Sequence, residues 1–266
     1  MNTSTFQKAA ELVWQHRQSG LPMPAFPSQC RPSSRKEGYA VQHTLNTLNG
    51  QPLAGWKIAA TSQAGQQHIG VSGPLVGRIF SPCVIPQGQT VSLKGVRMLV
   101  AEPEMCFVLG QDLPARDAAY SQAEVMSAIS DLHVAIEVPN SRFEDFVSVG
   151  EASLIADNAC AHEFVLGNPA PAAWRALDLS KHAVSAQVIR ANGQTWHRSG
   201  SGSAVLGDPR VAMTWMANEL RELGLPLKKG QFVTTGTCMV PLEIQAGDAV
   251  EVDFGLLGRI SVRFGE

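Results

Sequence analysis

The chain has 266 residues, 44% of them hydrophobic, with a formal net charge of −2 and a pI of about 6.4. This length and apolar content suffice for one large domain or two small ones. No basic run is longer than Lys228-Lys229, so we expect no nucleic-acid partner. No apolar run approaches the roughly 18 residues of a membrane span, so we expect no membrane partner either.

Cysteine and histidine usage narrows the chemistry further. The five cysteines are scattered without a Cys-x-x-Cys pair, and an odd number in apolar settings indicates buried thiols in a reducing compartment. Residues 1–20 carry charges among their apolar positions and do not resemble a signal peptide. We therefore expect a cytoplasmic protein. The seven histidines include no His-x-x-x-His pair, so zinc-protease chemistry has no support.

The first part of the chain is typical of helices. Apolar residues at helical spacing predict a helix over 3–18, and residues 20–32, with four prolines, form a connection. A second helix is predicted to begin at Ser34 and to end at Gly50. We expect residues 1–54 to form a helical N-terminal extension before a strand-rich body.

The body begins with a short predicted strand over residues 55–59, which contains Lys57 as its one cation. The commoner interpretation of such a lysine is a surface residue whose stem lies along apolar neighbours. Residues 60–82 then contain four glycines and two prolines. A long glycine-rich segment predicts a mobile lid, and the alternative is a short helix with a turn and no motion.

Two apolar runs carry three carboxylates. Read as a strand, residues 98–109 place Glu102 and Glu104 on one face, and both faces are apolar, which predicts burial. A capping box at Ser121 starts the helix that links this run to a second one, residues 133–138, which carries Glu137.

Unpaired buried carboxylates cost several kcal/mol or more, and like charges repel. Three carboxylates with no basic residue among them are typical of a site for a hard divalent cation such as Mg²⁺ or Mn²⁺. The alternative is that Glu102 and Glu104 line the solvent face of an edge strand, with Pro103 marking that edge.

The rest of the chain predicts more strands and one further long helix. Asn192-Gly193 is a hairpin signal, and residues 199–203 are interpreted as a flexible connector. A helix capped by Asp208 is predicted to run to Gly224. Strands are expected near 231–235, 248–254 and 259–264. We interpret residues 55–266 as one catalytic domain.

Several short motifs together resemble a known family. They are Gly55-Trp56-Lys57-Ile58, Glu102-Pro103-Glu104, Ala135-Ile136-Glu137, Ala156-Asp157-Asn158-Ala159 and Gly236-Thr237. Over roughly residues 38–264 their order is similar to that of the fumarylacetoacetate hydrolase superfamily, in its hydratase/decarboxylase branch. Within that branch the chain most resembles the 2-keto-4-pentenoate hydratases.

This resemblance implies an α+β fold, a mixed β-roll, often assembled as homo-oligomers. It implies Mg²⁺ or Mn²⁺ held by Glu102, Glu104 and Glu137, with Lys57 near the metal. Two departures concern the substrate. Leu75 stands in the loop where such hydratases carry an Asp, and Val100 stands where many members have an Arg.

The chemistry implied is metal-dependent hydration of a 2-hydroxy-2,4-dienoate or 2-oxo-4-enoate, a hydro-lyase reaction that gives a 4-hydroxy-2-oxo acid, as in meta-cleavage degradation of aromatic compounds. The metal would stabilise an enolate of the small-molecule 2-oxo acid. Lys57, in an apolar setting beside this cation, is expected to have a lowered pKa and would move protons. Thr237 and the backbone of Asn158 and Ala159 are candidates for the substrate carboxylate, and Asp157 either binds substrate or orients that loop.

Three other functions stay open. The first is decarboxylation of a 4-oxalocrotonate-like diacid. The second is C–C hydrolysis of an acylpyruvate, for which His68 and His133 are the nearby candidate bases. The third is a metal-dependent oxo-acid binding protein without turnover.

Overall fold

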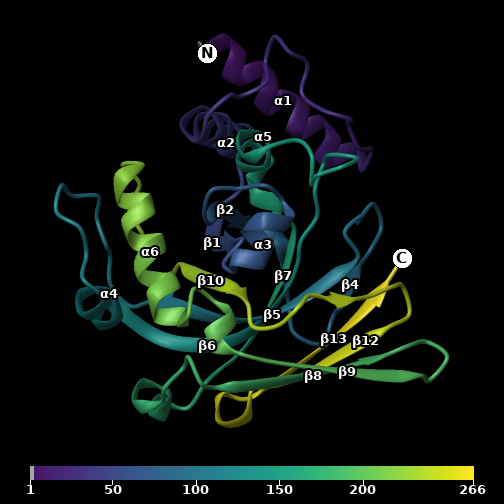
Figure 1. Cartoon of the computed structure of the whole chain (residues 1–266), viewed down its shortest axis with the longest axis vertical. Coiled ribbons are helices and arrows are strands. Elements are labelled where there is room, and N and C mark those ends of the chain that lie inside the picture. The colour runs from purple at the N-terminus through teal and green to yellow at the C-terminus, as the bar shows by residue number, and fades with distance from the viewer. Residues whose placement is uncertain (1–2) are drawn as a thin grey trace.

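The computed structural model describes residues 3–266, which form two β-sheets with helices packed around them (Figure 1). The helices are α1 (Thr3–Ser19), α2 (Arg35–Asn49), α3 (Gln63–His68), α4 (Gln122–Ala128), α5 (Glu151–Ala156) and α6 (Pro209–Glu222). The α+β fold class is therefore confirmed. No helix in the described range is long and apolar enough to cross a bilayer.

The N-terminal helices form as predicted. The Ser34 side chain caps α2 by accepting a hydrogen bond from the Glu37 N–H, and Gly50 ends the helix in the left-handed conformation. Helices α1 and α2 pack against each other and against α5, around a small core that includes Phe26 and Phe143. Figure 1 shows this group of helices at one end of the molecule. The extension thus rests on a helix of the body.

The larger sheet has eight strands, with the order β2-β1-β10-β5-β6-β7-β3 and β11 paired to β5. Its strands are β1 (Leu53–Ala59), β2 (Leu75–Phe80), β3 (Val84–Ile85), β5 (Val100–Leu109), β6 (Ile129–Val138), β7 (Glu163–Pro169), β10 (Phe232–Thr237) and β11 (Leu242–Glu243). Only residues 81–83 separate β2 and β3, which lie at opposite ends of the order. The sheet must therefore curl until its two ends meet, which makes it a roll.

The second sheet has five strands in the order β4-β13-β12-β8-β9. They are β4 (Thr90–Ser92), β8 (Ala183–Ile189), β9 (Thr195–Ser201), β12 (Ala249–Asp253) and β13 (Arg259–Gly265). Alternate residues such as Val184, Val252 and Val262 are buried on one face, as period-2 patterning requires. The predicted hairpin at Asn192-Gly193 joins β8 to β9, and the three predicted C-terminal strands are present.

The edge-strand alternative for Glu102 and Glu104 is wrong. Strand β5 lies between β10 and β6, in the middle of the larger sheet. Pro103 is tolerated there because it lies beyond the last pair of β5 with β10, Thr237 opposite Glu104. The pairing of β5 with β11 begins only at Ala101, so the ladder requires no N–H donor at Pro103.

Two other expectations also need correction. The segment 60–82 is not one glycine-rich loop, because it contains α3 and the fully buried strand β2, so a mobile lid can extend no further than residue 74. Residues 199–203 are not a flexible connector. They end β9 and start a short helical turn, and a Cβ at Gly200 would lie 2.0 Å from the Cys238 carbonyl oxygen. Close backbone packing requires glycine there.

Candidate functional site

The three predicted carboxylates come together inside the roll. Pairing of β5 with β6 places Glu102 directly opposite Glu137, and Glu104 follows on the same face of β5. One carboxylate oxygen from each residue lies within 4.8 Å of those from the other two. Glu104 and Glu137 are each 1% exposed, and Glu102 is half-buried. This is the buried acidic cluster that the alternating pattern predicted.

The protein satisfies only part of this cluster. Glu104 Oε2 accepts hydrogen bonds from the Thr234 hydroxyl and, at 2.8 Å, from the Gly236 N–H. Among the described residues, Glu104 Oε1 and Glu137 Oε2 have no hydrogen-bond partner. Burial raises the pKa of all three carboxyl groups, and repulsion from Glu137 adds to this at Glu102 and Glu104. Unpartnered buried oxygens in an all-oxygen donor set fit a hard divalent cation.

Lys57 lies beside the cluster. Its Nζ is 3.1 Å from Glu137 Oε1 and donates to the Ala159 carbonyl at 3.1 Å. Gly77 lies opposite Lys57 in the pairing of β1 with β2. A Cβ at Gly77 would lie 2.6 Å from the Asn158 carbonyl oxygen and 2.8 Å from Lys57 Cγ, so glycine leaves the space that the lysine stem occupies.

The expectation of a lowered Lys57 pKa depends on a neighbouring cation, whereas the protein's own charges act in the opposite direction. Burial does lower the pKa of this ammonium group, but the attraction of Glu137, followed by that of Glu102, outweighs burial and raises it above its ordinary value. The sequence showed the apolar strand around Lys57 but not that three acids surround it. The three acids therefore favour the protonated form of Lys57.

Residues Asn158, Ala159 and Cys160 form a rare left-handed turn, with φ values of 58°, 50° and 61°. Such conformations cost roughly 1–2 kcal/mol per residue and occur where surrounding structure holds them. The Asn158 side chain does so, since its Oδ1 accepts from the Arg78 N–H and its Nδ2 donates to the Arg78 carbonyl, both at 2.8 Å. No acceptor in the described chain pairs with the backbone N–H groups of Asn158 and Ala159.

The Asp157 side chain supports this turn from behind. It is fully buried, forms an ion pair with Arg142, and accepts from the Ser141 hydroxyl at 2.7 Å and from the Arg142 N–H at 3.0 Å. Its oxygens are therefore already engaged. Of the two predicted roles for Asp157, these contacts support orientation of the loop.

Thr237 lies opposite Glu104 in the pairing of β10 with β5, at the edge of the acidic cluster. Its hydroxyl donates to the Met239 carbonyl at 2.8 Å. The sequence analysis assigned no role to Thr234, Gly236 or Arg142, although Gly236 lies in one of the motifs shared with the family. The first two belong to a run of small polar residues that ends a strand, which was a usable signal, whereas nothing marked Arg142.

The two departures from the hydratase motifs have definite places. Leu75 is buried, pairs with Ala59, and is on the same face of β2 as Gly77. It therefore extends an apolar wall next to Lys57. Val100 begins β5 and pairs with Glu243 of β11.

The candidate bases for hydrolysis do not join the cluster. His133 is four residues from Glu137 along β6, about 13 Å at the usual rise, and its Nδ1 lies 2.8 Å from the Gly167 carbonyl oxygen. His68 packs edge-on against the Phe146 ring. This arrangement does not support a His–Glu pair for acylpyruvate hydrolysis.

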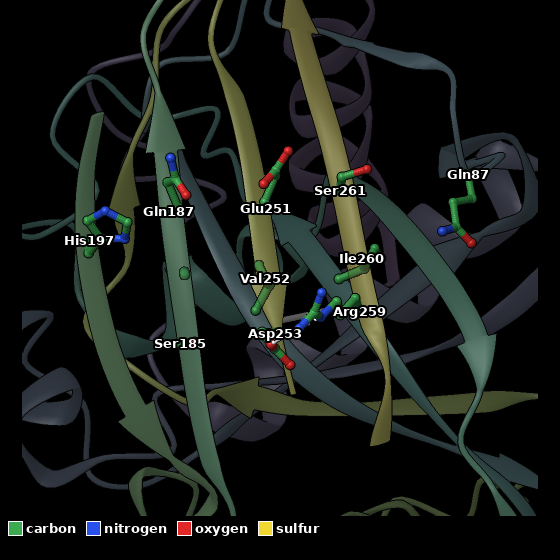
Figure 2. Close-up of a pocket in the computed structure, with 11 residues that line it drawn as sticks. Gln87, Ser185, Gln187, His197, Glu251, Val252, Asp253, Arg259, Ile260 and Ser261 are labelled. Carbon is green, nitrogen blue, oxygen red and sulfur yellow. Dashed lines mark hydrogen bonds and ion pairs between the residues drawn. The ribbon is translucent and has the colours of Figure 1, made fainter. Parts of the chain in front are cut away.

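A hollow of about 490 Å³ lies elsewhere, on the polar face of the second sheet. Figure 2 shows its side chains, among them Gln187, Glu251 and Ser261, projecting in one cross-strand row from β8, β12 and β13. They alternate with the buried residues of the same strands, as on any sheet with one face in water. We therefore do not assign the chemistry to this hollow.

Comparisons with known proteins agree with the geometry. The family described as fumarylacetoacetate (FAA) hydrolase C-terminal matches residues 62–264. A 2-keto-4-pentenoate hydratase of Burkholderia vietnamiensis is 32% identical over 86% of this chain and 85% of its own length. A 2-hydroxyhexa-2,4-dienoate hydratase of Comamonas testosteroni is 31% identical over 84% of this chain and 82% of its own.

Among solved structures, the 4-oxalocrotonate decarboxylase of Pseudomonas putida G7, complexed with magnesium and adipate, superposes with a TM-score of 0.88. It is 25% identical, and the match covers 99% of this chain and 98% of that one. The fold expected from the resemblance, including the N-terminal helices, is therefore confirmed.

Proposed function

Because the chain belongs to the fumarylacetoacetate hydrolase family, we propose that it is a divalent-metal-dependent hydro-lyase of the 2-keto-4-pentenoate hydratase type. It would add water to a 2-hydroxy-2,4-dienoate or 2-oxo-4-enoate and give a 4-hydroxy-2-oxo acid, in the meta-cleavage degradation of aromatic compounds. The observation that carries this proposal is the buried cluster of three carboxylates beside Lys57, with oxygens that the protein leaves unpartnered.

Glu102, Glu104 and Glu137 would hold the cation, which we propose to be Mg²⁺ or Mn²⁺. A bound cation of this kind polarises the keto oxygen of a 2-oxo acid and stabilises negative charge there. The similar decarboxylase is complexed with magnesium in one structure and with calcium in another, which supports a divalent cation here.

The substrate carboxylate would lie at the left-handed turn. The N–H groups of Asn158 and Ala159 have no acceptor in the described chain, and consecutive N–H groups in such a turn form an anion-binding concavity. Thr237, opposite Glu104, would border the same space. Asp157 and Arg142 would hold the turn in place without touching the substrate.

Lys57 would carry the proton. Its Nζ is fixed by Glu137 and the Ala159 carbonyl, and the surrounding acids favour its protonated form. A 2-hydroxy-2,4-dienoate becomes a ketone when a proton is delivered to the far end of its conjugated system. Lys57 would deliver that proton and regain one from the enol hydroxyl, which loses its proton as the ketone forms. Addition of water to the remaining double bond then places the hydroxyl on C4 and the proton from water on C3, and Lys57 would relay that proton.

The test is a turnover panel with 2-hydroxypentadienoate, 4-oxalocrotonate and acetylpyruvate, each with Mg²⁺, with Mn²⁺ and with chelator. We expect metal-dependent turnover of 2-hydroxypentadienoate to the hydrated product. Turnover that is equally fast in chelator, or activity on acetylpyruvate alone, would contradict the proposal. Metal-dependent binding of all three compounds without turnover would indicate a binding protein.

A second candidate function is decarboxylation of a 4-oxalocrotonate-type diacid. Leu75 favours it, because an apolar side chain occupies a position where hydratases of this type carry a carboxylate near the lysine. In such a diacid the carboxylate lost is the distal one, which is conjugated with the keto group through the double bond. The electron pair of the broken C–C bond passes to the keto oxygen as a dienolate, so the step needs charge stabilisation there but no positioned water. Release of CO₂ from 4-oxalocrotonate, measured in the same panel, would favour this candidate over hydration.

Three further proposals concern the whole protein. We propose that it is a cytoplasmic homo-oligomer and that residues 1–54 are an extension of a catalytic unit formed by residues 55–266. The packing of α1 and α2 against α5 supports an extension that is docked on the catalytic unit. Analytical ultracentrifugation tests the assembly, and a monomer at micromolar concentration would contradict it.

A further inference from the structure

A small pocket of about 40 Å³ lies behind the left-handed turn, between the end of α1 and two loops of the body. Positive side chains line it from three separate parts of the chain. They are Arg17 at the end of α1, Lys94 and Arg97 in the loop before β5, and Arg142 after β6. Among the described residues that line the pocket, none is Asp or Glu.

The charge of these residues is only partly neutralised. Arg142 is paired with the buried Asp157, but Arg17 donates to two neutral acceptors, the Ala161 carbonyl at 3.0 Å and the Cys83 thiol at 3.1 Å.

The side chains of Lys94 and Arg97 are exposed and have no ionic partner in the part of the chain that the structure describes. Glu163 does not line the pocket, but its Oε1 lies 3.9 Å from Nε2 of His162, which does. Burial raises the pKa of Glu163 to about 7, so it is a weak counter-charge. Four cations therefore face one fully charged carboxylate.

The pocket also contains an uncharged nitrogen that lacks a partner. Within the described chain, the buried Nδ1 of His162 has no hydrogen-bond partner. Burial and the charges of Arg17 and Arg142 lower the pKa of His162 to about 3, so its ring is neutral near pH 7 and Nδ1 can donate in one tautomer. An oxygen-bearing anion would meet both the excess charge and this nitrogen.

We propose that this pocket binds a small oxyanion with the size and charge of inorganic phosphate. Its volume is several times the roughly 10–15 Å³ that one water needs, and too small for a metabolite. Guanidinium groups match the oxygens of phosphate well. The bound anion would link α1 to residues 140–142, two of which donate hydrogen bonds to Asp157. It would therefore stabilise the contact between the N-terminal extension and the body.

The test is thermal unfolding of the full-length protein during a titration with sodium phosphate, at constant ionic strength maintained with sodium chloride. We expect a rise in melting temperature that saturates, because a ligand that binds only the folded state stabilises it. Hydrogen exchange should slow in residues 16–22 and 140–142. No rise at matched ionic strength would overturn the proposal.

Two double variants distinguish phosphate binding in this pocket from a non-specific effect of positive charge on the surface. The double variant Lys94→Gln/Arg97→Gln changes two exposed side chains, so it should fold normally, and its phosphate affinity by calorimetry should fall at least tenfold. The matched control, Lys8→Gln/Lys36→Gln, removes the same charge from exposed positions outside the pocket and should keep the wild-type affinity. Equal phosphate affinity in both double variants would overturn the assignment.

Discussion

Two charged clusters lie on either side of the Asn158–Cys160 turn, and they differ in whether their buried carboxylates are paired within the protein. In the acidic cluster, three carboxylates share Lys57 as their nearest cation, through Glu137. In the cluster behind the turn, Arg142 and Asp157 form a buried pair. The turn connects them, because Ala159 accepts from Lys57 while Ala161 accepts from Arg17 and Arg142.

The difference lies in how completely each cluster is satisfied. Both oxygens of Asp157 have partners within the protein, so its charge completes a structural network. Glu104 and Glu137 each keep an oxygen without a hydrogen-bond partner in the described chain. Burial alone does not distinguish a structural acid from a functional one. Unsatisfied oxygens on several neighbouring carboxylates do, since buried charges that repel one another persist only where a ligand compensates them. A single such oxygen does not, because Asp248 Oδ1 is also unpartnered beside the ion pair of Asp248 with Arg190.

The largest effect is expected on turnover, when Lys57, the lysine beside the acidic cluster, is changed. Lys57→Met keeps the apolar stem and removes the proposed proton carrier, so kcat should fall by about 10²–10⁴-fold. Steady-state kinetics with Mg²⁺ on the substrate panel measures this, with circular dichroism to check the fold. Lys36→Met, at an exposed position of α2, is the control and should behave as wild type. Near-full activity of Lys57→Met on every substrate would make Lys57 structural.

Changes to the paired cluster of Arg142 and Asp157 should lower the free energy of unfolding. Asp157→Asn leaves the Arg142 charge buried without its partner, which typically costs about 3–5 kcal/mol. Urea unfolding measures the free energy of unfolding directly. Glu251→Gln makes the same change of charge on an exposed strand position and should stay within about 0.5 kcal/mol of wild type. A similarly small effect for Asp157→Asn would remove the distinction between the clusters.

The opposite sign is expected for an acid of the unsatisfied cluster. In Glu104→Gln the amide oxygen can still accept from Thr234 and Gly236, while repulsion among the carboxylates falls. Without metal, the variant should therefore unfold at the same temperature as wild type or higher.

The Mg²⁺ affinity of this variant should fall by at least the ten- to hundredfold that loss of an outer-shell partner costs. Calorimetry with Mg²⁺ checks the affinity, and thermal unfolding in chelator checks the stability. An unchanged Mg²⁺ affinity would exclude Glu104 as a ligand.

The smallest effect expected is on the pH dependence of stability, through His162, which lies near Arg17 and Arg142. The pKa of His162 is lowered to about 3 by burial and by Arg17 and Arg142, so below pH 6.5 the unfolded chain binds a proton at this position that the folded protein does not. Stability is therefore lost as pH falls from 6.5 toward 3.

In His162→Gln, the loss of stability between pH 7 and pH 5 should be smaller by about 2 kcal/mol, at 1.36 kcal/mol per pH unit. Urea unfolding at the two pH values, in buffers without phosphate, measures it. An identical pH dependence in both proteins would show that His162 becomes protonated in the folded state.

Local patterns predicted most of the elements of this fold. The Ser34 cap, the Asn192-Gly193 hairpin and the alternation along β5 are short-range signals, and the structure follows them. The errors at 60–82 and 199–203 have a common cause. Glycine was interpreted as a sign of mobility, whereas Gly77 and Gly200 are required because other backbone segments approach closely. Such approaches depend on tertiary packing, which a single sequence does not display.

The same limit applies to the site. The acids were identified because two carboxylates on a strand with apolar faces are anomalous, and the structure brings them together. The charge state of Lys57 and the orientation of the Asp157 side chain were not accessible, since each depends on a partner more than ten residues away. Patterns along the chain can identify an anomalous residue, but the structure is needed to identify its partners.

The place of β10 has a consequence for the order in which the protein is made. This strand lies between β1 and β5 (Figure 1), yet it is synthesised long after both. As the nascent chain leaves the ribosome, no strand yet lies between β1 and β5, so the facing edges of these two strands are exposed. Glu104 obtains Thr234 and Gly236 only when residues 232–237 insert. The acidic cluster is therefore completed only after residues 232–237 have emerged, well after its three carboxylates, so the cation proposed there would be held with full affinity only after that step.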